Sequence, residues 1–499
     1  MKWKLLFAIS IFWALGSGCA SPNLAPQAPD KPWQPEKASQ PTGTPAGTTS
    51  LKFVVPADPA LPYERGEVHV DSAHPYTLPE LIDLAERSSP DTRIAWEQSR
   101  QAAFSVGLEE AAYLPKVTAE VLGGLEHLPT PIPDNVDPRG YFNLNAKEIL
   151  PSLVIKWLLF DFGKRKGKIE AAKQTSVAAN VAFTGAHQKL IFDVAKAYFA
   201  LDADRAQLHV AEEALKTSKT LQEASEAKKK RGLETQTEVA MARRGTAKAQ
   251  FDLEKSRAAA NDAYHALLEA MGLTPTIRLQ IDESAGRTLP KGLADEVRSY
   301  IDRALVRRPD IVASLAKLRA SDGEITAAKA EYYPTIGVEG LVSQNIGSLN
   351  IDNGPNYRVN EPSASILMKI SFPLYDGGVR KDKLEIERSK NAQAQQELSK
   401  VQDEAVRQVA KTYDAVKSAL AEYQSALALV EASNLSYSSA LGSYQGGVGT
   451  FTDAVSTETD KVQALSAQAQ AYASVLTAAA ALAFSTGELT STEALNSAP

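Results

Sequence analysis

Four segments of the chain have sequences typical of β-strands, and the clearest of them alternates apolar and more polar residues so that one face is apolar. The clearest is 363–376, where Ile366, Met368, Ile370 and Phe372 alternate with a leucine, a lysine and a serine. The other three segments are 115–128, 149–162 and 334–347. Each is longer than the roughly 9–11 residues that cross a membrane as a tilted strand. Loops rich in proline, glycine and asparagine, 129–140 and 347–362, are expected to join the strands in pairs.

Long stretches without proline follow each strand pair. Lys164–Lys230 and Arg380–Tyr444 are rich in Ala, Gln, Lys and Glu, which are strong helix formers. About 65 residues at a rise of 1.5 Å per residue would span about 100 Å, a length that a globular domain does not need. A turn that contains glycine ends each stretch, and a return helix then runs to Met271 or to Phe484.

The same order of elements occurs twice along the chain. Pro309 and Pro334 follow Pro90 and Pro115 at the same distance along the chain, and we call this distance the larger offset. A slightly shorter one, the smaller offset, matches Asp161 with Asp376, Tyr198 with Tyr413, and Met271 with Thr486. The chain is therefore a tandem duplication, and each half consists of a helix, two strands, a long helix and a return helix. We expect repeat one at 76–273, a connecting segment at 274–294, repeat two at 295–489 and a C-terminal tail at 490–499.

The first residues form a targeting segment. Lys2 and Lys4 precede an apolar stretch, Leu5–Leu15, and small residues then lead to Cys19, the only cysteine of the chain. This arrangement resembles a bacterial lipoprotein signal that is cleaved before a lipidated Cys19. An ordinary signal peptide cleaved nearby is the alternative, because Gly16 stands where lipoprotein signals usually have leucine.

Two N-terminal regions are expected from this pattern. Residues 1–18 are the lipoprotein signal peptide, and 19–75 begin with the lipidated cysteine. The segment that follows the cysteine is rich in Pro, Gly, Ser and Thr, which predicts an extended tether between the bilayer and the folded body.

Composition excludes several classes of function. The net charge is −6, so no overall basic surface suggests nucleic acid as a partner. The sequence contains no run of 18 or more apolar residues, so no membrane-spanning helix is predicted. Zinc-protease, cysteine-cluster and nucleophile-elbow motifs are all absent from the sequence. We therefore expect no enzyme activity, no metal site and no cofactor.

The number of predicted strands has a consequence for assembly. Each half supplies two strands and the chain supplies four, whereas a membrane barrel needs about eight or more strands and no open edge. The chain is therefore expected to form oligomers, and three copies would supply twelve strands.

The doubled patterns "RPDI…AAKAEYYPTI" and "PLYDGGVRK", with G-x-x-T-x-x-[DE] turns at the helix ends, resemble TolC-like outer-membrane efflux proteins. The resemblance covers roughly 76–489, and the N-terminal signal is similar to that of the lipoprotein branch. It implies a mixed α and β membrane protein whose homotrimer forms a twelve-stranded β-barrel, with four strands per chain. It also implies that this barrel in the outer membrane continues into a long α-helical tunnel in the periplasm.

The partners and the function are implied by the same resemblance. A periplasmic adaptor protein and an inner-membrane pump would complete a tripartite efflux system. The tunnel would export small molecules such as drugs, toxins or metal ions, without chemistry of its own.

The resemblance further implies a gate at the periplasmic tip, where the helix pairs turn. It puts Asp453 at an acidic constriction and Tyr444 at the position of a gate tyrosine, with Glu238 as the equivalent carboxylate of repeat one. In a trimer, the two carboxylates would form two acidic rings that favour cations. The gate arginine of some members falls at Gly449, so its salt bridge is absent here. A simpler alternative is that both carboxylates only stabilise helix N-termini.

Two basic clusters are further candidate sites. The first lies at the tip and is a possible adaptor contact, although such a run also suits a solvated helix C-terminus. It consists of Lys228, Lys229, Lys230 and Arg231, with Gly232 and Gly447 in the adjoining turns. The second follows the second strand of each repeat, where it would meet anionic lipid headgroups or line the tunnel mouth. It consists of Lys164, Arg165, Lys166, Lys168, Arg380, Lys381 and Lys383.

Two other functions remain open from the sequence. A duct for type I protein secretion would have the same fold. A lipid-anchored coiled-coil scaffold or adhesin would not need two strand pairs, and it would show sustained heptads that these alanine-rich helices lack.

Overall fold

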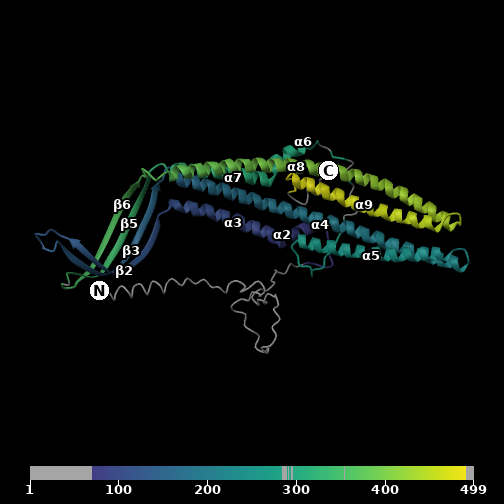
Figure 1. Ribbon diagram of the computed structural model, residues 1–499, viewed down its shortest axis with the longest axis horizontal. Coiled ribbons are helices and arrows are strands. Elements are labelled where there is room, and N and C mark those ends of the chain that lie inside the picture. Colours follow the sequence, from purple (N-terminus) through teal and green to yellow (C-terminus); the bar gives the residue numbers. More distant parts are fainter. Residues whose placement is uncertain are drawn as a thin grey trace, which may run out of the picture. The chain divides into compact units, whose positions relative to one another are not determined.

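The computed structural model describes residues 70–136, 138–283, 289, 292–293, 296–352 and 354–489. The predicted signal peptide, Cys19 and the C-terminal tail lie outside the described residues, as does most of the predicted tether. In the described part, Figure 1 shows a sheet at one end of the folded unit and long helices that extend away from it.

The helices of the two repeats have equivalent bounds. Repeat one contains α2 (Leu78–Ser88), α3 (Pro90–Glu110), the short 3₁₀ helix η2 (Ala111–Tyr113), α4 (Lys164–Lys230) and α5 (Gln236–Ala270). Repeat two contains α6 (Val297–Arg307), α7 (Pro309–Ala330), α8 (Val379–Gln445) and α9 (Phe451–Ser485). Moving α4 and α5 by the smaller offset gives the bounds of α8 and α9, so the duplication predicted from the sequence is confirmed. Both α4 and α8 contain 67 residues, which is a length of about 100 Å.

Two short helices were not predicted. Both α2 and α6 contain 11 residues and precede the helix that was expected to open each repeat. The sequence did carry a signal for α2, because Thr77 and Glu80 form a capping box in which the Thr77 N–H donates to Glu80 Oε2 at 2.8 Å.

Four antiparallel strands form one sheet in the order β2-β3-β5-β6. They are β2 (Lys116–Pro131), β3 (Tyr141–Phe160), β5 (Thr335–Ile351) and β6 (Tyr357–Ser371). The hairpins of the two repeats have the same register, since the larger offset moves Lys116 to Thr335 and the smaller one moves its partner Lys156 to Ser371. The repeats meet where β3 pairs with β5. A parallel pair of two-residue strands, β1 (Pro75–Tyr76) and β4 (Gln280–Ile281), lies apart from this sheet.

The strands are longer than predicted. The segment 347–362 was expected to be a loop, but β5 continues to Ile351 and β6 begins at Tyr357. Its asparagines suggested turns, yet their side chains bond across the sheet. Asn145 Nδ2 donates to Asn350 Oδ1 at 2.9 Å, and Gln344 Nε2 donates to Asn360 Oδ1 at 2.7 Å. Such cross-strand pairs stabilise the sheet, so the prediction of a long loop was wrong.

The helices pack in two hairpins, α4 with α5 and α8 with α9 (Figure 1). Helix α3 packs along α4, and α7 contacts both α4 and α8. The backbones of α4 and α7 come very close at Gly167 and Gly323. A Cβ on Gly167 would lie 2.6 Å from the Ala327 nitrogen, and one on Gly323 would lie 2.7 Å from the Gly167 oxygen. This crossing therefore requires glycine on both helices.

The remaining helix contacts consist largely of small residues. Buried alanines recur along α4 at positions 171, 178, 195, 203 and 211. Among the described helices, none has a stretch apolar and long enough to cross a membrane.

Candidate channel wall and helical tip

The two faces of the sheet differ in polarity. One face carries exposed apolar residues on all four strands, among them Leu125, Trp157 and Ile366, which are 80%, 42% and 83% exposed. On the opposite face, Lys369 Nζ lies 3.4 Å from Glu339 Oε1. A sheet with one exposed apolar face and one polar face is typical of the wall of a membrane barrel with an aqueous interior.

Each repeat passes from strand to long helix through the same ion pair. Asp161 Oδ2 accepts hydrogen bonds from the Arg165 backbone N–H and from Arg165 Nε, both at 2.9 Å. In repeat two, Asp376 Oδ2 accepts from the Arg380 N–H at 3.1 Å and from Arg380 Nε at 2.7 Å. Gly163, with a φ of 102°, supplies the left-handed residue that this turn needs.

Arg165 also fixes the end of β3. Its guanidinium donates to the carbonyl oxygens of Ala112, Leu158 and Leu159 at 2.7–3.1 Å. Arg165 is buried, with 6% of its surface exposed. Its role in the described chain is therefore to join strand, η2 and α4, and it is not available to a lipid headgroup.

A carboxylate at the end of α7 connects the two long helices. Glu331 accepts from Lys164 at 2.7 Å and from Lys383 at 3.2 Å. These two lysines hold the pKa of Glu331 below its usual value. Lys166 and Lys381 remain exposed beside this junction, and Lys168 is half-buried.

At the other end of the helices, the two tip turns have the same construction. Gly232 and Gly447 adopt φ values of 75° and 78° after the long helices. Thr235 then caps α5, with Glu238 Oε2 accepting from the Thr235 N–H at 2.7 Å. Thr450 caps α9, where its Oγ1 accepts from the Asp453 N–H at 3.1 Å. These predicted gate carboxylates thus both take part in helix caps, and Thr235 lowers the pKa of Glu238 by hydrogen bonding to it.

A polar cluster joins the two hairpins between these turns. The Tyr444 hydroxyl of α8 donates to Glu234 Oε1 in the first turn, and Ser225 Oγ of α4 donates to Glu234 Oε2. Lys228 Nζ lies 3.8 Å from Glu234 Oε1 and 3.5 Å from the centre of the Tyr444 ring. It also donates to the Tyr444 carbonyl oxygen at 3.2 Å. The Glu234 side chain is only 5% exposed, and the cation that lies beside its carboxylate within the tip is Lys228.

Apolar contacts hold the same tyrosine in place. The Tyr444 ring packs edge-on against Phe451, with ring centres 5.7 Å apart, in a cluster with Leu221 and Ala242. Burial, assisted by the Glu234 carboxylate, raises the pKa of Tyr444. The hydroxyl therefore stays protonated and donates its hydrogen bond throughout the physiological pH range.

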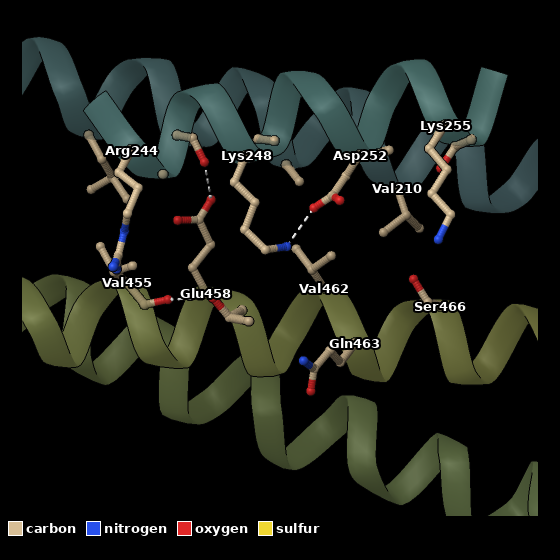
Figure 2. Close-up of a pocket in the computed structure, with 18 of the residues that line it drawn as sticks. Val210, Arg244, Lys248, Asp252, Lys255, Val455, Glu458, Val462, Gln463 and Ser466 are labelled. Atoms are coloured by element: carbon tan, nitrogen blue, oxygen red, sulfur yellow. Dashed lines mark hydrogen bonds and ion pairs between the residues drawn. The ribbon is translucent and has the colours of Figure 1, made fainter. Parts of the chain in front are cut away.

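A groove of about 960 Å³ lies between α5 and α9 and is also lined by α4. Figure 2 shows Arg244, Lys248 and Lys255 of α5 facing Glu458 of α9 across this space. Lys248 Nζ bonds to Asp252 Oδ2 at 2.6 Å. Glu458 is 7% exposed and accepts one long hydrogen bond from Ser218, at 3.4 Å. Burial raises the pKa of Glu458 to about 7.

With this geometry established, comparison with known proteins is informative. The model of the family described as "Outer membrane efflux protein" matches residues 81–273 and 300–488, one segment in each repeat. The chain belongs to this family. The family consists of efflux proteins of the outer membrane, not of enzymes, in agreement with the absence of catalytic motifs from the sequence.

Two curated members illustrate the degree of similarity. Protein CyaE of Bordetella pertussis is 24% identical over 352 residues, which cover 70% of this chain and 71% of CyaE. The cation efflux system protein CusC of Escherichia coli K12 is 25% identical, and the alignment covers 61% of this chain and 63% of CusC. The chain thus aligns with less than two thirds of CusC.

A solved structure supports the same fold. The outer membrane protein VceC of Vibrio cholerae has a TM-score of 0.68 and 20% sequence identity, and covers 82% of this chain and 96% of its own. The predicted fold class, a tandem-repeat protomer with four barrel strands and a long helical tunnel segment, is confirmed.

Within this family fold, the structure brings only some of the predicted tip residues together. Tyr444 and Lys228 meet in the cluster between the hairpins, whereas Lys229, Lys230, Arg231 and Asp453 are exposed. Two functional candidates were missed. Glu234 sits three residues after Arg231 with no motif that marks it, and Glu458 lies in an alanine-rich helix where one carboxylate gave no signal. Among the described residues, no group of three potential metal ligands gathers.

Proposed function

We propose that this chain forms the outer-membrane exit duct of a tripartite efflux system. The observation that carries the proposal is the four-stranded sheet of the described chain, with one apolar face, two unpaired edges and a polar face that leads into helices about 100 Å long. Three copies would close the sheet into a barrel and surround a water-filled path. The cargo would be small molecules or metal ions, the latter in line with the name of the cation efflux relative CusC.

The gate of this duct is the helical tip. Tyr444 and Glu234 hold the two hairpins of one chain together, which supports a closed tip when the cluster is intact. Glu238 and Asp453 cap the neighbouring helices, and in a trimer they would add two rings of carboxylates around the axis. Opening would separate the hairpins and break the contact between Tyr444 and Glu234.

The adaptor would contact the exposed ends of the same turns. Lys229, Lys230 and Arg231 project from the first turn, next to Leu233, which is 71% exposed. In the second turn the equivalent Val448, beside Gly447, is 87% exposed. Exposed apolar residues, with cations beside Leu233 in the first turn, suit a protein partner with complementary acidic groups. Lys228 is not included in this surface because it contacts Tyr444 and Glu234.

The membrane contacts would lie at the opposite end. Lys166, Lys168 and Lys381 are placed beside the junction of sheet and helices, where anionic headgroups would meet them. Lys164, Lys383 and Arg380 are partly neutralised by Glu331 and Asp376, so their contribution would be smaller. The lipidated Cys19 would provide a second anchor to the outer membrane.

Single-channel recording of the purified full-length chain in planar bilayers tests the proposal. Discrete, small conductances that favour cations are expected. A folded oligomer that never conducts, in wild type or in the tip variant Tyr444→Phe, would contradict the function as a duct and favour a scaffold.

A further inference from the structure

The polar face of the sheet carries two lysines directly opposite each other. Lys116 of β2 pairs with Lys156 of β3, and Lys156 also lies opposite Glu339, which places both lysines on the polar face. Both are exposed, and within the described residues neither forms an ion pair. Like charges at such positions have Cβ atoms about 5 Å apart and destabilise an antiparallel pair. The stability of the hairpin therefore does not explain why both residues are lysine.

The duplication shows that the hairpin forms without the two lysines. Thr335 and Ser371 are the equivalents of Lys116 and Lys156 in repeat two, and they pair in the same way across β5 and β6. The same hairpin is thus built with two neutral hydroxyl side chains at these positions. Because the lysine pair belongs to repeat one alone and opposes folding, its role is more consistent with binding than with structure.

A hollow of about 790 Å³ lies beside the two lysines, and both line it. Gly337 of β5 is also part of the lining and has no side chain to fill the space. Leu114 and Pro115, which connect η2 to β2, add an apolar side. The hollow thus combines a pair of cations with an apolar surface, and its volume suits a small organic molecule.

The hollow has an excess of positive charge. Among the described residues that line it, Glu339 is the single carboxylate, and its Oε1 lies 3.4 Å from Lys369 Nζ. This ion pair is neutral as a whole, so the charges of Lys116 and Lys156 remain without a counter-charge. Glu120, the next carboxylate of β2 on this face, is four residues from Lys116, about 13 Å along the strand, where salt screens most of its charge.

We propose that the hollow binds a small organic anion that carries a doubly charged oxyanion, such as a phosphate monoester. The oxyanion lies between Lys116 and Lys156, and the apolar part of the molecule lies against Leu114 and Pro115. Two ammonium groups suit this ligand because lysine binds phosphate as a point charge and needs no fixed hydrogen-bond geometry. The inference rests on the proposed function, in which the polar face lines the duct, and it names organic anions as a class of exported molecule.

Fluorine NMR of the ligand tests the site, with para-fluorophenylphosphonate as the probe and para-fluorobenzyl alcohol as its neutral counterpart. The sample is the purified full-length protein in a non-ionic detergent at about pH 8, where lysine side chains are charged. Wild type is expected to bind the phosphonate at least tenfold more tightly than the alcohol, and added salt should weaken only the phosphonate. Equal binding of the two probes, or no binding of the phosphonate, would overturn the proposal.

The duplication supplies the variants. Lys116→Thr/Lys156→Ser copies the pair that repeat two already carries. It should weaken phosphonate binding at least tenfold without lowering the melting temperature, because two like charges are removed. Binding as in wild type would show that the inference is wrong.

The converse variant tests the same idea as a gain. Thr335→Lys/Ser371→Lys builds a second lysine pair in the equivalent hairpin and should raise the amount of phosphonate bound at saturation about twofold. This variant keeps Lys116 and Lys156, so it tests the proposal even if the first variant folds poorly. No increase from a folded variant would count against the lysine pair as the binding element.

A matched control removes two cations from the opposite face. Lys147 and Arg358 both pair with Ser348, and Lys147 also pairs with Leu125 of the apolar face. Lys147→Thr/Arg358→Ser changes the net charge by the same amount as the first variant and should leave phosphonate binding unchanged. An equal loss in this control would mean that exposed cations attract the probe in general, which would overturn the site.

Binding and conductance together distinguish the two ways to fail. A wild type that conducts but does not bind the phosphonate would keep the duct and remove the site. A wild type that binds the phosphonate but never conducts would keep the site and remove the interpretation of its ligand as an exported molecule.

Discussion

The two tip turns have the same backbone but different side chains. Thr235 and Thr450 cap their helices in the same way, and Gly232 and Gly447 adopt the same left-handed conformation. In contrast, the position equivalent to Tyr444 in repeat one is Lys229, which is exposed.

The carboxylate in the cluster has no counterpart either. The equivalent of Glu234 in repeat two is Gly449, where a Cβ would lie 2.8 Å from Ser443. The contact between the hairpins is therefore made by residues that are not equivalent. The two repeats therefore have the same backbone at their tips but different side chains. The second hairpin carries the hydrogen-bond donor, Tyr444, and the first carries the acceptor, Glu234. Equivalent positions also differ at the crossing of α4 and α7. Its glycines, Gly167 and Gly323, correspond to Asp382 and Phe104 in the other repeat.

The largest effect is expected from Gly323→Leu. The new side chain would begin 2.7 Å from the Gly167 oxygen and force α4 away from α7. The cost is expected to be on the order of 3 kcal/mol or more, which exceeds the gain of about 1 kcal/mol in helix propensity. A large loss of folded protein in thermal unfolding checks this. Phe104→Leu, at the equivalent position of α3 where the side chain is 68% exposed, should fold normally, and an equal loss would mean that the close approach of α4 and α7 is not the cause.

A smaller effect, dependent on pH, is expected from Glu458→Gln. The pKa of Glu458 in the folded chain is about 7 and thus higher than the ordinary value of 4.5. The folded state binds the proton more tightly, so wild-type stability falls as the pH rises from about 4.5 to 7 and is constant above that. The glutamine variant lacks this loss and should be more stable at pH 8 by on the order of 2 to 3 kcal/mol.

Melting temperatures of the variant and wild type at pH 5 and pH 8 measure this difference. Gln463→Glu is an informative control, because it places a carboxylate at another position that lines the same groove. If Glu458→Gln and the wild type had the same melting temperature at pH 8, ionisation of Glu458 would cost the wild type little stability, with Lys461 nearby.

Tyr444→Phe is expected to break the asymmetric tip contact. The buried Glu234 would lose one of its donors, at a cost of about 1–3 kcal/mol to the closed tip. Single-channel conductance should then rise at least twofold. Lys229→Ala, at the equivalent position of repeat one, should leave conductance unchanged. The opposite pattern would move the gate from Tyr444 to the first turn.

The smallest effects are expected from the two caps. Thr235→Ala and Thr450→Ala should each reduce stability by about 1 kcal/mol, because each removes an acceptor from a helix N-terminus. Melting temperatures would measure both losses. Similar losses of stability would confirm that the two caps are equivalent, whereas a much larger loss in one variant would show that its threonine has a further role.

The sequence predicted the elements better than their contacts. The long helices and the duplication were visible because proline is absent and two offsets recur. The length of β5 and β6 was missed because asparagine favours turns locally, and only cross-strand pairing shows that it is used otherwise here. Arg165 was grouped with surface cations, although the spacing of Asp161 to Arg165 recurs as Asp376 to Arg380 and could have indicated an ion pair.

The contacts of the tip cluster could not be predicted from the sequence pattern. Glu234 and Tyr444 are separated by 210 residues, and their equivalents in the other repeat differ in type. Neither periodicity nor internal repetition connects such a pair. Only the side-by-side placement of the two hairpins does.

The pairing of β3 with β5 also constrains how the protein is made. Ser152 and Ser343 are partners although they belong to different repeats, so the centre of the wall cannot form until β5 of repeat two has been exported. Contacts of such long range slow folding and leave strands open to wrong partners meanwhile. The helices, whose backbone hydrogen bonds are local, can form within microseconds, so the wall is expected to form later than the individual helices.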